Sequence, residues 1–458
     1  MKPTVFDQID IKRLGIILAA PVVSILIAVM VSFRSQRFIL VGIVGAIGAI
    51  ILFQQPIFGL IFAAGPALAI PLGLSTGSNT QVNITMLAIS GVCGVWIVGL
   101  LTKKYKFHTL DQGHTKAALG LCGVAILAFL FGQMTWLSFA DHAPITAQVG
   151  GVFLYIVSAG AFLATANLVT GIIQIQWMTG AFIAFGTLYI LGRLMPVIGN
   201  RFLFLFHDTG SLFWLMMTCL PFALAVFTPK LNFAIRIGLL VICFSTLYIG
   251  LTAGRSWTSG WLPALCGLIA MMFFVNIKAG IGFLGAGFLV IFLALQSIQE
   301  VVMVGDNEYS LVTRLAAWDI LAQIIRSNPI LGVGPANYYF YTPIFTLMGY
   351  SSLRFNSHNN YVDLLAQTGI LGLAIFLWFV FAIFKTAWNL KKRLQPSFVR
   401  AFSIGMIGVL IGLLVAGMLG DWVIPFVYNV GFRGFITSGC AWIFLGCIAA
   451  IDRLNDGN

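Results

Sequence analysis

Four residues of this sequence could together bind a phosphate-linked group and transfer it. Arg201, Arg255 and Arg314 lie in polar stretches between long apolar runs, and His358 stands in the run Ser357-His358-Asn359-Asn360. A guanidinium group binds two phosphate oxygens at once and keeps its charge when it is partly desolvated. A neutral imidazole can take or donate a proton near neutral pH. The residue types therefore indicate arginines that neutralise a leaving phosphate and a histidine that removes a proton.

Each of these residues also has a structural interpretation. A single arginine at a membrane interface commonly extends its side chain to lipid headgroups. His358 could equally cap a helix or contact a headgroup, because polar residues surround it. Asp306 and Glu308 could form a carboxylate pair for glycoside hydrolysis or a cation site. No further ligand stands near them in sequence, so a solvated loop is favoured.

The sequence contains no pattern that is typical of a metal or nucleotide site. Its seven cysteines lie inside apolar runs without CxxC spacing and are interpreted as small core residues. The glycine-rich run at 331–335 is not followed by Lys-Ser/Thr, as a nucleotide-binding loop would be. We therefore expect neither a metal nor a cofactor.

The elements that must position these residues are helices in a membrane. The chain has 458 residues, of which 60% are hydrophobic and 8% charged, and its mean hydropathy is +1.01. This composition excludes an ordinary soluble protein. Apolar runs of about 20 residues recur about 12 to 14 times. Because runs such as 38–53 are apolar on every face, they indicate helices and not a barrel.

The predicted fold is thus an all-α integral membrane protein with about 12 to 14 transmembrane helices and one larger external loop. The proline pair Pro66 and Pro71 indicates that one span, 56–74, is kinked or re-entrant. The predicted spans are 14–32, 38–53, 56–74, 84–102, 117–138, 149–169, 172–192, 211–228, 232–252, 257–275, 279–298, 365–388, 402–420 and 431–450. We divide the chain into an N-terminal bundle at 1–298, an external loop domain at 299–364 and C-terminal helices at 365–458.

Clusters of basic residues set the expected orientation. Lysines at 103, 104, 106 and 116 form one cluster, and basic residues between 385 and 400 form another. The positive-inside rule places both in the cytoplasm, so 299–364 is external and both termini are cytoplasmic. Arg34 and Arg37 then lie outside, against the rule. The net charge of +12 is explained by this rule and by contact with membrane lipids, without nucleic acid.

The external segment differs from the rest of the chain because it is rich in acidic residues. They are Glu300, Asp306, Glu308, Asp319 and Asp363. Within the segment, residues 313–327 carry apolar residues at helical spacing, from Leu315 through Trp318 to Ile325, and Pro329 ends the run. This pattern predicts an amphipathic helix at the membrane surface. Ser357 or Asn359 is then available to cap the helix that follows.

Two runs in this region resemble the signature of the O-antigen ligase and O-antigen polymerase family of bacterial membrane glycosyltransferases. They are RLAAWDILAQIIRSNPILGVGPANYY, which begins at Arg314, and SHNNYVDLLAQTGILGLAIF, which begins at Ser357. The residues that match the family pattern are Arg314, Trp318, Pro329, Gly332, Gly334, His358, Asn359, Gly369 and Gly372. Upstream, Arg255 fits the family's arginine just outside a span, and Arg201 is the candidate for an earlier one.

The resemblance implies a chemistry at the outer face of the bacterial inner membrane. The donor would be a glycan linked to a polyprenyl pyrophosphate, such as undecaprenyl pyrophosphate, and the acceptor a glycan or a lipid A core sugar. Transfer would need no metal or nucleotide. Arg255, Arg201 and Arg314 would neutralise the departing pyrophosphate, and His358 would remove the proton of the acceptor hydroxyl. A single displacement at the anomeric carbon, with inversion, is expected.

Supporting roles are expected for Trp318, Asn359, Gly332, Gly334 and Tyr361. The main alternative is a transporter for a small anion or a lipid-linked sugar, which would use the arginines to bind substrate and His358 to carry protons. Transporters usually place their sites near the bilayer midplane, and these spans are nearly free of charge there. A third hypothesis is a structural subunit of polysaccharide export.

Overall fold

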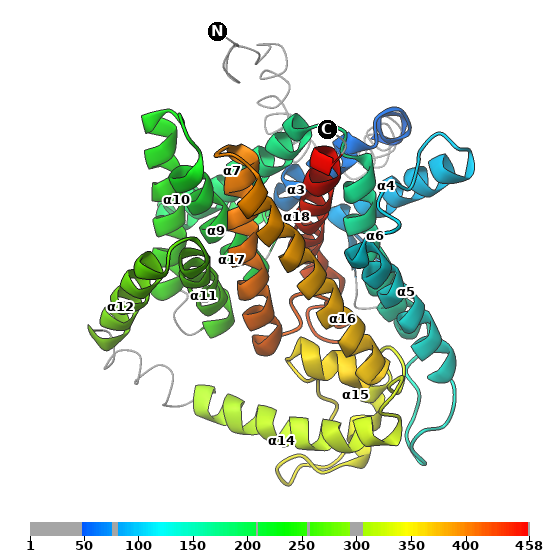
Figure 1. Cartoon of the computed structure of the whole chain (residues 1–458). Helices are drawn as coiled ribbons and strands as arrows, with labels where there is room; N and C mark the ends of the chain where they lie inside the picture. Colours follow the sequence, from blue (N-terminus) through cyan, green and yellow to red (C-terminus); the bar gives the residue numbers. More distant parts are fainter. Residues whose placement is uncertain (1–47, 76–80, 208, 254–256, 294–305, 457–458) are drawn as a thin grey trace.

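The computed structural model describes residues 48–75, 81–207, 209–253, 257–293 and 306–456, which are almost wholly helical (Figure 1). Within these residues, nine helices are long and apolar enough to cross a membrane. They are α4 (Ile84–Leu101), α5 (Gly113–Phe131), α6 (Ile145–Leu168), α7 (Ile172–Leu194), α10 (Phe233–Leu251), α11 (Thr258–Val275), α16 (Asn360–Arg393), α17 (Phe398–Leu419) and α18 (Gly431–Asp456). The chain is therefore a multi-pass all-α membrane protein, as predicted.

The remaining elements are shorter or lie outside the bundle. They are α3 (Ile57–Ala64), α8 (Pro196–Gly199), α9 (Ser211–Phe227), α12 (Ile277–Leu293), α14 (Asp306–Ser327), α15 (Tyr338–Tyr341), the 3-10 helices η1 (Pro66–Ala69), η2 (Leu203–Leu205) and η3 (Thr342–Ile344), and the strands β1 (Gly73–Ser75) and β2 (Gln81–Asn83). The two strands pair antiparallel, with Leu74 opposite Val82. Of these elements, α9 and the described part of α12 are apolar helices of fewer than 18 residues.

The predicted span at 56–74 is not one continuous helix. Helix α3 ends after eight residues, η1 follows, and the chain then enters β1. Gly65 separates the two helices, and Pro66 begins the second. A proline removes a helical hydrogen bond and clashes with the preceding turn, so a straight span cannot form here. The predicted span at 14–32 and most of that at 38–53 lie outside the described residues.

Helix α18 lies at the centre of the bundle. Its large rings Trp442 and Phe444 are buried, and they pack against Phe379 of α16 and Phe182 of α7 with ring centroids 4.9 and 5.4 Å apart. Contacts with α6, α16, α4 and α3 surround it. Because helices pack around α18 on every side, it holds in place the loop that precedes it, residues 420–430.

Hydrogen bonds tie together one end of the bundle, which we call the lysine end. Here Arg453 donates to the carbonyl of Val169, Lys391 donates to that of Phe274, and Arg393 pairs with Asp452. The lysines of the described helices and loops all lie near this end, at 103, 104, 106, 116, 230, 278, 385, 391 and 392.

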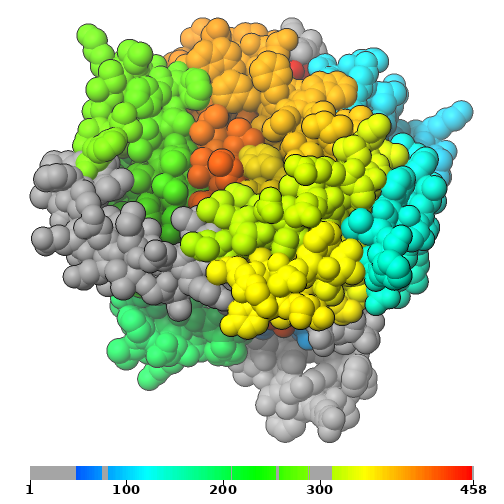
Figure 2. Space-filling model, turned by 90° about the horizontal axis from the view of Figure 1, so that it is seen from below, coloured from blue at the N-terminus to red at the C-terminus, as the bar shows by residue number. Residues whose placement is uncertain are grey.

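The opposite end is the arginine end, because its basic residues within the described part of the chain are arginines alone. They are Arg193, Arg201, Arg314, Arg326, Arg354 and Arg433. Helix α14 lies across this end, and Figure 2, seen from that side, shows α14 and the segment after it spread over the face. The arginine end therefore carries the region that the sequence predicts to be external.

Helix α14 confirms the predicted helix at 313–327 and begins earlier, at Asp306. It buries Ala317, Ile320, Leu321 and Ile324 against the loop and α15. Leu315, which the pattern assigns to the apolar stripe, is instead 53% exposed. The apolar stripe is broader than the face that packs, so the stripe alone does not define which residues are buried.

Glycines let the chain after α14 approach two helices closely, with Gly332 and Gly369 at the contact with α16 and Gly334 at the end of α5. Gly332 and Gly334 have φ of +69° and +93°, and Gly369 interrupts α16 with φ of +66°. A Cβ on Gly369 would lie 2.1 Å from the carbonyl oxygen of Ile330. Backbone N–H groups of Val333 and Ile370 bond across this contact at 2.8 and 2.9 Å. The glycines of the signature therefore allow two backbones to approach closely.

We expect Gly369→Ala to lower the melting temperature of the purified protein. The backbone of Gly369, with φ of +66° and ψ of −169°, lies in a region that is essentially restricted to glycine and costs an alanine about 1–3 kcal/mol. The clash with Ile330 adds to this cost. Gly123→Ala in α5 is the control, because nothing lies within 4 Å of its added Cβ and alanine favours a helix. Equal melting temperatures for the two variants in detergent would contradict this account of the kink.

Candidate functional site

His358 lies in the loop that leads into α16, and a neighbour on each side holds it. Asn359 caps α16, and its side-chain oxygen accepts the N–H groups of Tyr361 and Val362 at 2.9 and 3.3 Å. The backbone of His358 has φ of +48°, a conformation that side chains other than glycine seldom adopt. Strain of this kind persists only where surrounding bonds enforce it.

Hydrogen bonds between buried side chains at the start of α16 hold His358 in this backbone conformation. Ser357 Oγ lies 2.7 Å from Oδ1 of Asp363 and accepts the N–H of Asn359 at 2.9 Å. The hydroxyl of Tyr338 donates to the same carboxylate oxygen at 2.6 Å. All of these side chains are buried. The loop around His358 is therefore anchored in a buried polar cluster at the start of α16, built on Oδ1 of Asp363.

Helix α14 contributes Trp318 and Arg314 to the same place. The indole Nε1 of Trp318 donates to the carbonyl oxygen of Ser357 at 2.8 Å, directly before His358. Arg314 lies one turn earlier on the helix. Burial lowers the pKa of His358 below its usual value, and the positive charge of Arg314 lowers it further. The structure thus brings together three residues that the sequence singled out.

Asn429 connects His358 to the buried carboxylate of Asp421. The direction of these hydrogen bonds determines which ring nitrogen of His358 carries the proton. Nδ2 of Asn429 lies 3.2 Å from Nδ1 of His358 and also donates to Oδ1 of Asp421. When Asp421 is ionised, its carboxylate only accepts hydrogen bonds, so the amide nitrogen of Asn429 faces it. The same nitrogen then donates to Nδ1 of His358. In this state the neutral ring carries its proton on Nε2.

Hydrogen bonds stabilise the charged form of Asp421, although the group is buried. Burial raises the pKa of this carboxyl group, while hydrogen bonds from the N–H of Phe426, at 2.7 Å, and from Asn429 act in the opposite direction. The ionised form of Asp421 therefore holds the Asn429 amide in the orientation described above.

Asn360 and Tyr361 hold this site against the C-terminal helices. The Asn360 amide donates to the carbonyl of Ile424 and accepts from the N–H of Val423, both at 2.8 Å. The hydroxyl of Tyr361 donates to the carbonyl of Leu414 in α17 at 2.7 Å. Tyr361, expected as a supporting residue, thus joins α16 to α17.

Of the other predicted charged residues, only Arg201 has a side chain that the structure describes, and it is not part of this cluster. Arg201 follows α8, and its side chain is exposed, without a hydrogen bond or ion pair to the described residues. Arg255 lies outside the described residues. The side chains of Asp306 and Glu308 are also outside the description. Among the described residues, no three His, Cys, Asp or Glu side chains form a group that could hold a metal ion.

Three residues of the site were not identified from the sequence: Asp421, Asn429 and Tyr338. A partial signal was present, because Asp421 is a rare acidic residue at the external end of a predicted span. Tyr338 lies in the first quoted run, but its role follows only from its bond to Asp363. Asn429 carries no charge and stands in no motif, and its role follows only from its contact with His358, 71 positions away.

Comparison with known protein families agrees with the position of this site. A model of the O-antigen ligase family matches residues 202–377. The matched region contains Arg314, Trp318, His358 and Asn359, and it begins just after Arg201. No curated protein matches the chain. Asp421 and Asn429 lie beyond the matched region.

We expect the pKa of His358 to rise in Arg314→Gln, because a nearby positive charge disfavours the imidazolium form. The measurement is an NMR titration of the protein labelled with ¹⁵N-histidine. Arg326→Gln is the matched control, since it removes an exposed arginine from the same helix three turns away. An unchanged pKa in Arg314→Gln would show that the two side chains do not interact.

Proposed function

From the match of residues 202–377 to a model of the O-antigen ligase family, we propose a specific transfer reaction for this chain. In it, a glycan moves from undecaprenyl pyrophosphate to a sugar hydroxyl, during ligation or polymerisation of an O-antigen-type surface polysaccharide. The observation that carries the proposal is the Trp318–Ser357 hydrogen bond, which brings Arg314 and His358 to one site.

The arginines are proposed to bind the pyrophosphate. Arg314 is partly buried beside His358, where a guanidinium group interacts more strongly with a phosphate than it would in water. Arg255 and Arg201 are proposed to supply the rest of the positive charge that neutralises the pyrophosphate. Trp257, the first described residue after Arg255, packs edge-on against Trp422 at 5.7 Å, next in sequence to Asp421. This contact supports including Arg255.

The proposed reaction is a single displacement. The acceptor oxygen forms a bond to the anomeric carbon while the bond from that carbon to the pyrophosphate oxygen breaks. The electron pair of the broken bond leaves with the pyrophosphate, and fixed guanidinium groups neutralise the charge. The hydroxyl proton passes to His358. Attack opposite the leaving group inverts the anomeric centre, and the proposal needs no metal ion.

His358 can accept this proton at Nε2 only after a rearrangement. While Asp421 is ionised, Nε2 carries the proton, because Asn429 then donates to Nδ1. If the Asn429 amide turns by half a rotation, its oxygen accepts Nδ1–H and leaves Nε2 free. Protonation of Asp421, whose pKa burial raises to about 6, permits this turn. We therefore propose that the base-competent form of His358 is controlled by Asp421 and Asn429.

The charge distribution supports an orientation in the bacterial inner membrane. The lysine end would face the cytoplasm under the positive-inside rule, with both termini there. The arginine end would then meet the donor and a glycan or lipid A core acceptor outside. In the described spans, charged side chains lie near the helix ends, which favours an interfacial site over a midplane transport site.

We expect both Arg314→Ala and His358→Ala to abolish transfer, with losses of at least about 100-fold. Arg314→Lys should restore little, because a lysine cannot bind two phosphate oxygens with one planar group. The assay is transfer of a labelled lipid-linked glycan by the protein in proteoliposomes, with Arg326→Ala as control. Full activity in Arg314→Ala together with His358→Ala would refute the proposed site.

The same assay tests the metal-free mechanism, since activity should survive EDTA. Deletion of the gene separates the two acceptor classes. Capped single repeats would indicate a polymerase, and unattached long chains would indicate a ligase.

Asp421→Asn should keep or raise activity at pH 7 if His358 is the base. The oxygen of the introduced amide can still accept the N–H of Phe426, which turns its NH₂ group toward Asn429. The side-chain oxygen of Asn429 must then accept hydrogen bonds from the new NH₂ group at position 421 and from Nδ1–H of His358. Nε2 of His358 then carries no proton and can act as the base. Asn429→Leu removes the amide, so neither orientation can hold the ring of His358, and activity should fall. A loss in Asp421→Asn as large as in Asn429→Leu would argue against the base role. Histidine ¹⁵N shifts report the tautomer directly.

A further inference from the structure

A second polar site lies at the lysine end, far from His358, between α5, α16 and α18. A cleft of about 440 Å³ opens there. His114 lines it from α5, Trp378, Phe381, Lys385 and Asn389 from α16, and Asp452 from α18. We propose that this cleft binds an anionic phospholipid whose headgroup carries a hydroxyl group, as in a phosphatidylglycerol.

Along one face of α16, apolar side chains are followed by polar side chains, which matches the order of acyl chains and headgroup in a lipid. Trp378, Phe381, Lys385 and Asn389 follow one another at intervals of three or four residues, so they lie along one face. Trp378 and Phe381 are 46% and 64% exposed, although they stand within a span. Acyl chains would thus pack on the two rings, and the phosphate would reach Lys385.

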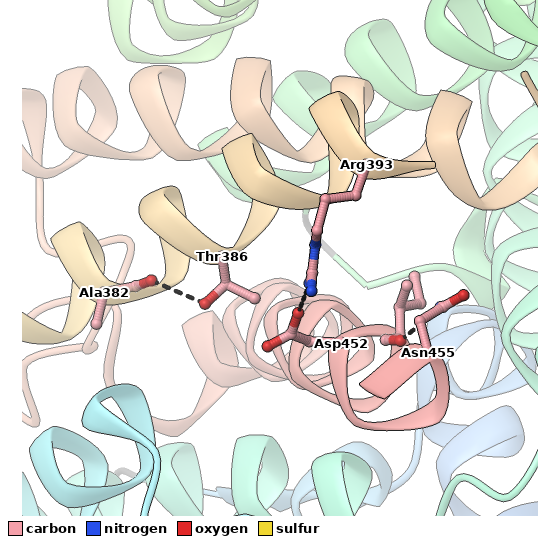
Figure 3. Close-up of polar contacts among 6 residues, drawn as sticks. Ala382, Thr386, Arg393, Asp452 and Asn455 are labelled. Atoms are coloured by element: carbon pink, nitrogen blue, oxygen red, sulfur yellow. Dashed lines mark hydrogen bonds and ion pairs between the residues drawn. The ribbon is translucent and has the colours of Figure 1, made fainter. Parts of the chain in front are cut away.

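Neighbouring groups at this end are already engaged, as Figure 3 shows. Arg393 forms an ion pair with Asp452, and the hydroxyl of Thr386 donates to the carbonyl of Ala382 at 3.1 Å. Lys385, by contrast, makes no ion pair with any described residue and has an exposed side chain. Its positive charge is therefore available to a phosphate, which the leaflet on the lysine side supplies.

His114 provides the observation that points to a ligand with a hydrogen-bond donor. It is 2% exposed, and its Nε2 has no hydrogen-bond partner among the described residues. Its Nδ1 lies 3.2 Å from Oγ1 of Thr115, whose hydroxyl donates to Thr109 at 3.0 Å. With Nδ1 donating to Thr115, Nε2 keeps a lone pair that no described residue satisfies, in a side chain that lines the cleft. A headgroup hydroxyl would satisfy this buried acceptor.

The phosphate and the hydroxyl together select the ligand. Inorganic phosphate would satisfy Lys385 but would leave Trp378 and Phe381 uncovered. A phosphatidylcholine would cover the two rings, but its headgroup has no net charge for Lys385 and no hydrogen-bond donor for His114. A phosphatidylglycerol provides acyl chains, one negative charge and hydroxyl donors, so it matches all three parts of the cleft.

The test is native mass spectrometry of the full-length protein with added phosphatidylglycerol or phosphatidylcholine, together with melting temperatures. We expect phosphatidylglycerol to bind more tightly than phosphatidylcholine and to raise the melting temperature. Lys385→Gln should weaken its binding about fivefold. His114→Phe should weaken it as well, since it removes the lone pair but keeps a ring of similar size. Lys104→Gln, an exposed lysine outside the cleft, is the matched control.

Three outcomes would overturn the proposal. They are equal binding of the two lipids, equal binding by Lys385→Gln and Lys104→Gln, and a rise in melting temperature with inorganic phosphate as large as that with phosphatidylglycerol. The last would identify a site for soluble anions instead. Melting temperatures without lipid show whether His114→Phe is folded, and Lys385→Gln changes only an exposed side chain. Neither result depends on the proposed transfer reaction at the opposite end.

Discussion

The hydrogen bond from the Trp318 indole to the carbonyl of Ser357 is the contact on which the arginine-end site depends. Helix α14 lies across the bundle and is not threaded through it, so its position is set by one buried face and by such contacts. The bond fixes the backbone immediately before His358. Because Arg314 lies one turn from Trp318, the same bond determines the distance between guanidinium and imidazole.

The loop around His358 must hold a strained conformation without regular secondary structure. It does so because its buried polar groups bond to one another: Ser357 and Tyr338 to Asp363, and Asn429 to Asp421. In a medium of low polarity, such bonds are stronger than in water and costly to break. The ring of His358 is therefore oriented by a carboxylate that it does not touch, through the amide of Asn429. A change in the protonation of Asp421 can therefore alter the orientation of the Asn429 amide and, through it, the hydrogen bond to His358.

Most of this fold can be predicted from the sequence because the membrane restricts the structures that an apolar segment can form. Each long apolar run must form a helix, since lipid cannot satisfy an exposed backbone. The cap at Asn359 also follows local rules. The span at 56–74 was predicted as kinked or re-entrant, but its end in a short hairpin depends on tertiary contacts. Asp421 and Asn429 were missed for a related reason: their role exists only where two loops distant in sequence meet.

The two ends of the bundle impose different demands on a positive charge. At the lysine end, a flexible ammonium suffices to hold the chain in the membrane and to meet lipid phosphates. In the proposed orientation the arginine end is external, where the positive-inside rule disfavours basic residues, so the arginines there call for a role of their own. Their restriction to arginine, among the described residues, fits the proposed binding of a pyrophosphate. A planar guanidinium group binds two phosphate oxygens at once and so adds a fixed geometry to its charge, whereas the ammonium group of lysine acts as a point charge.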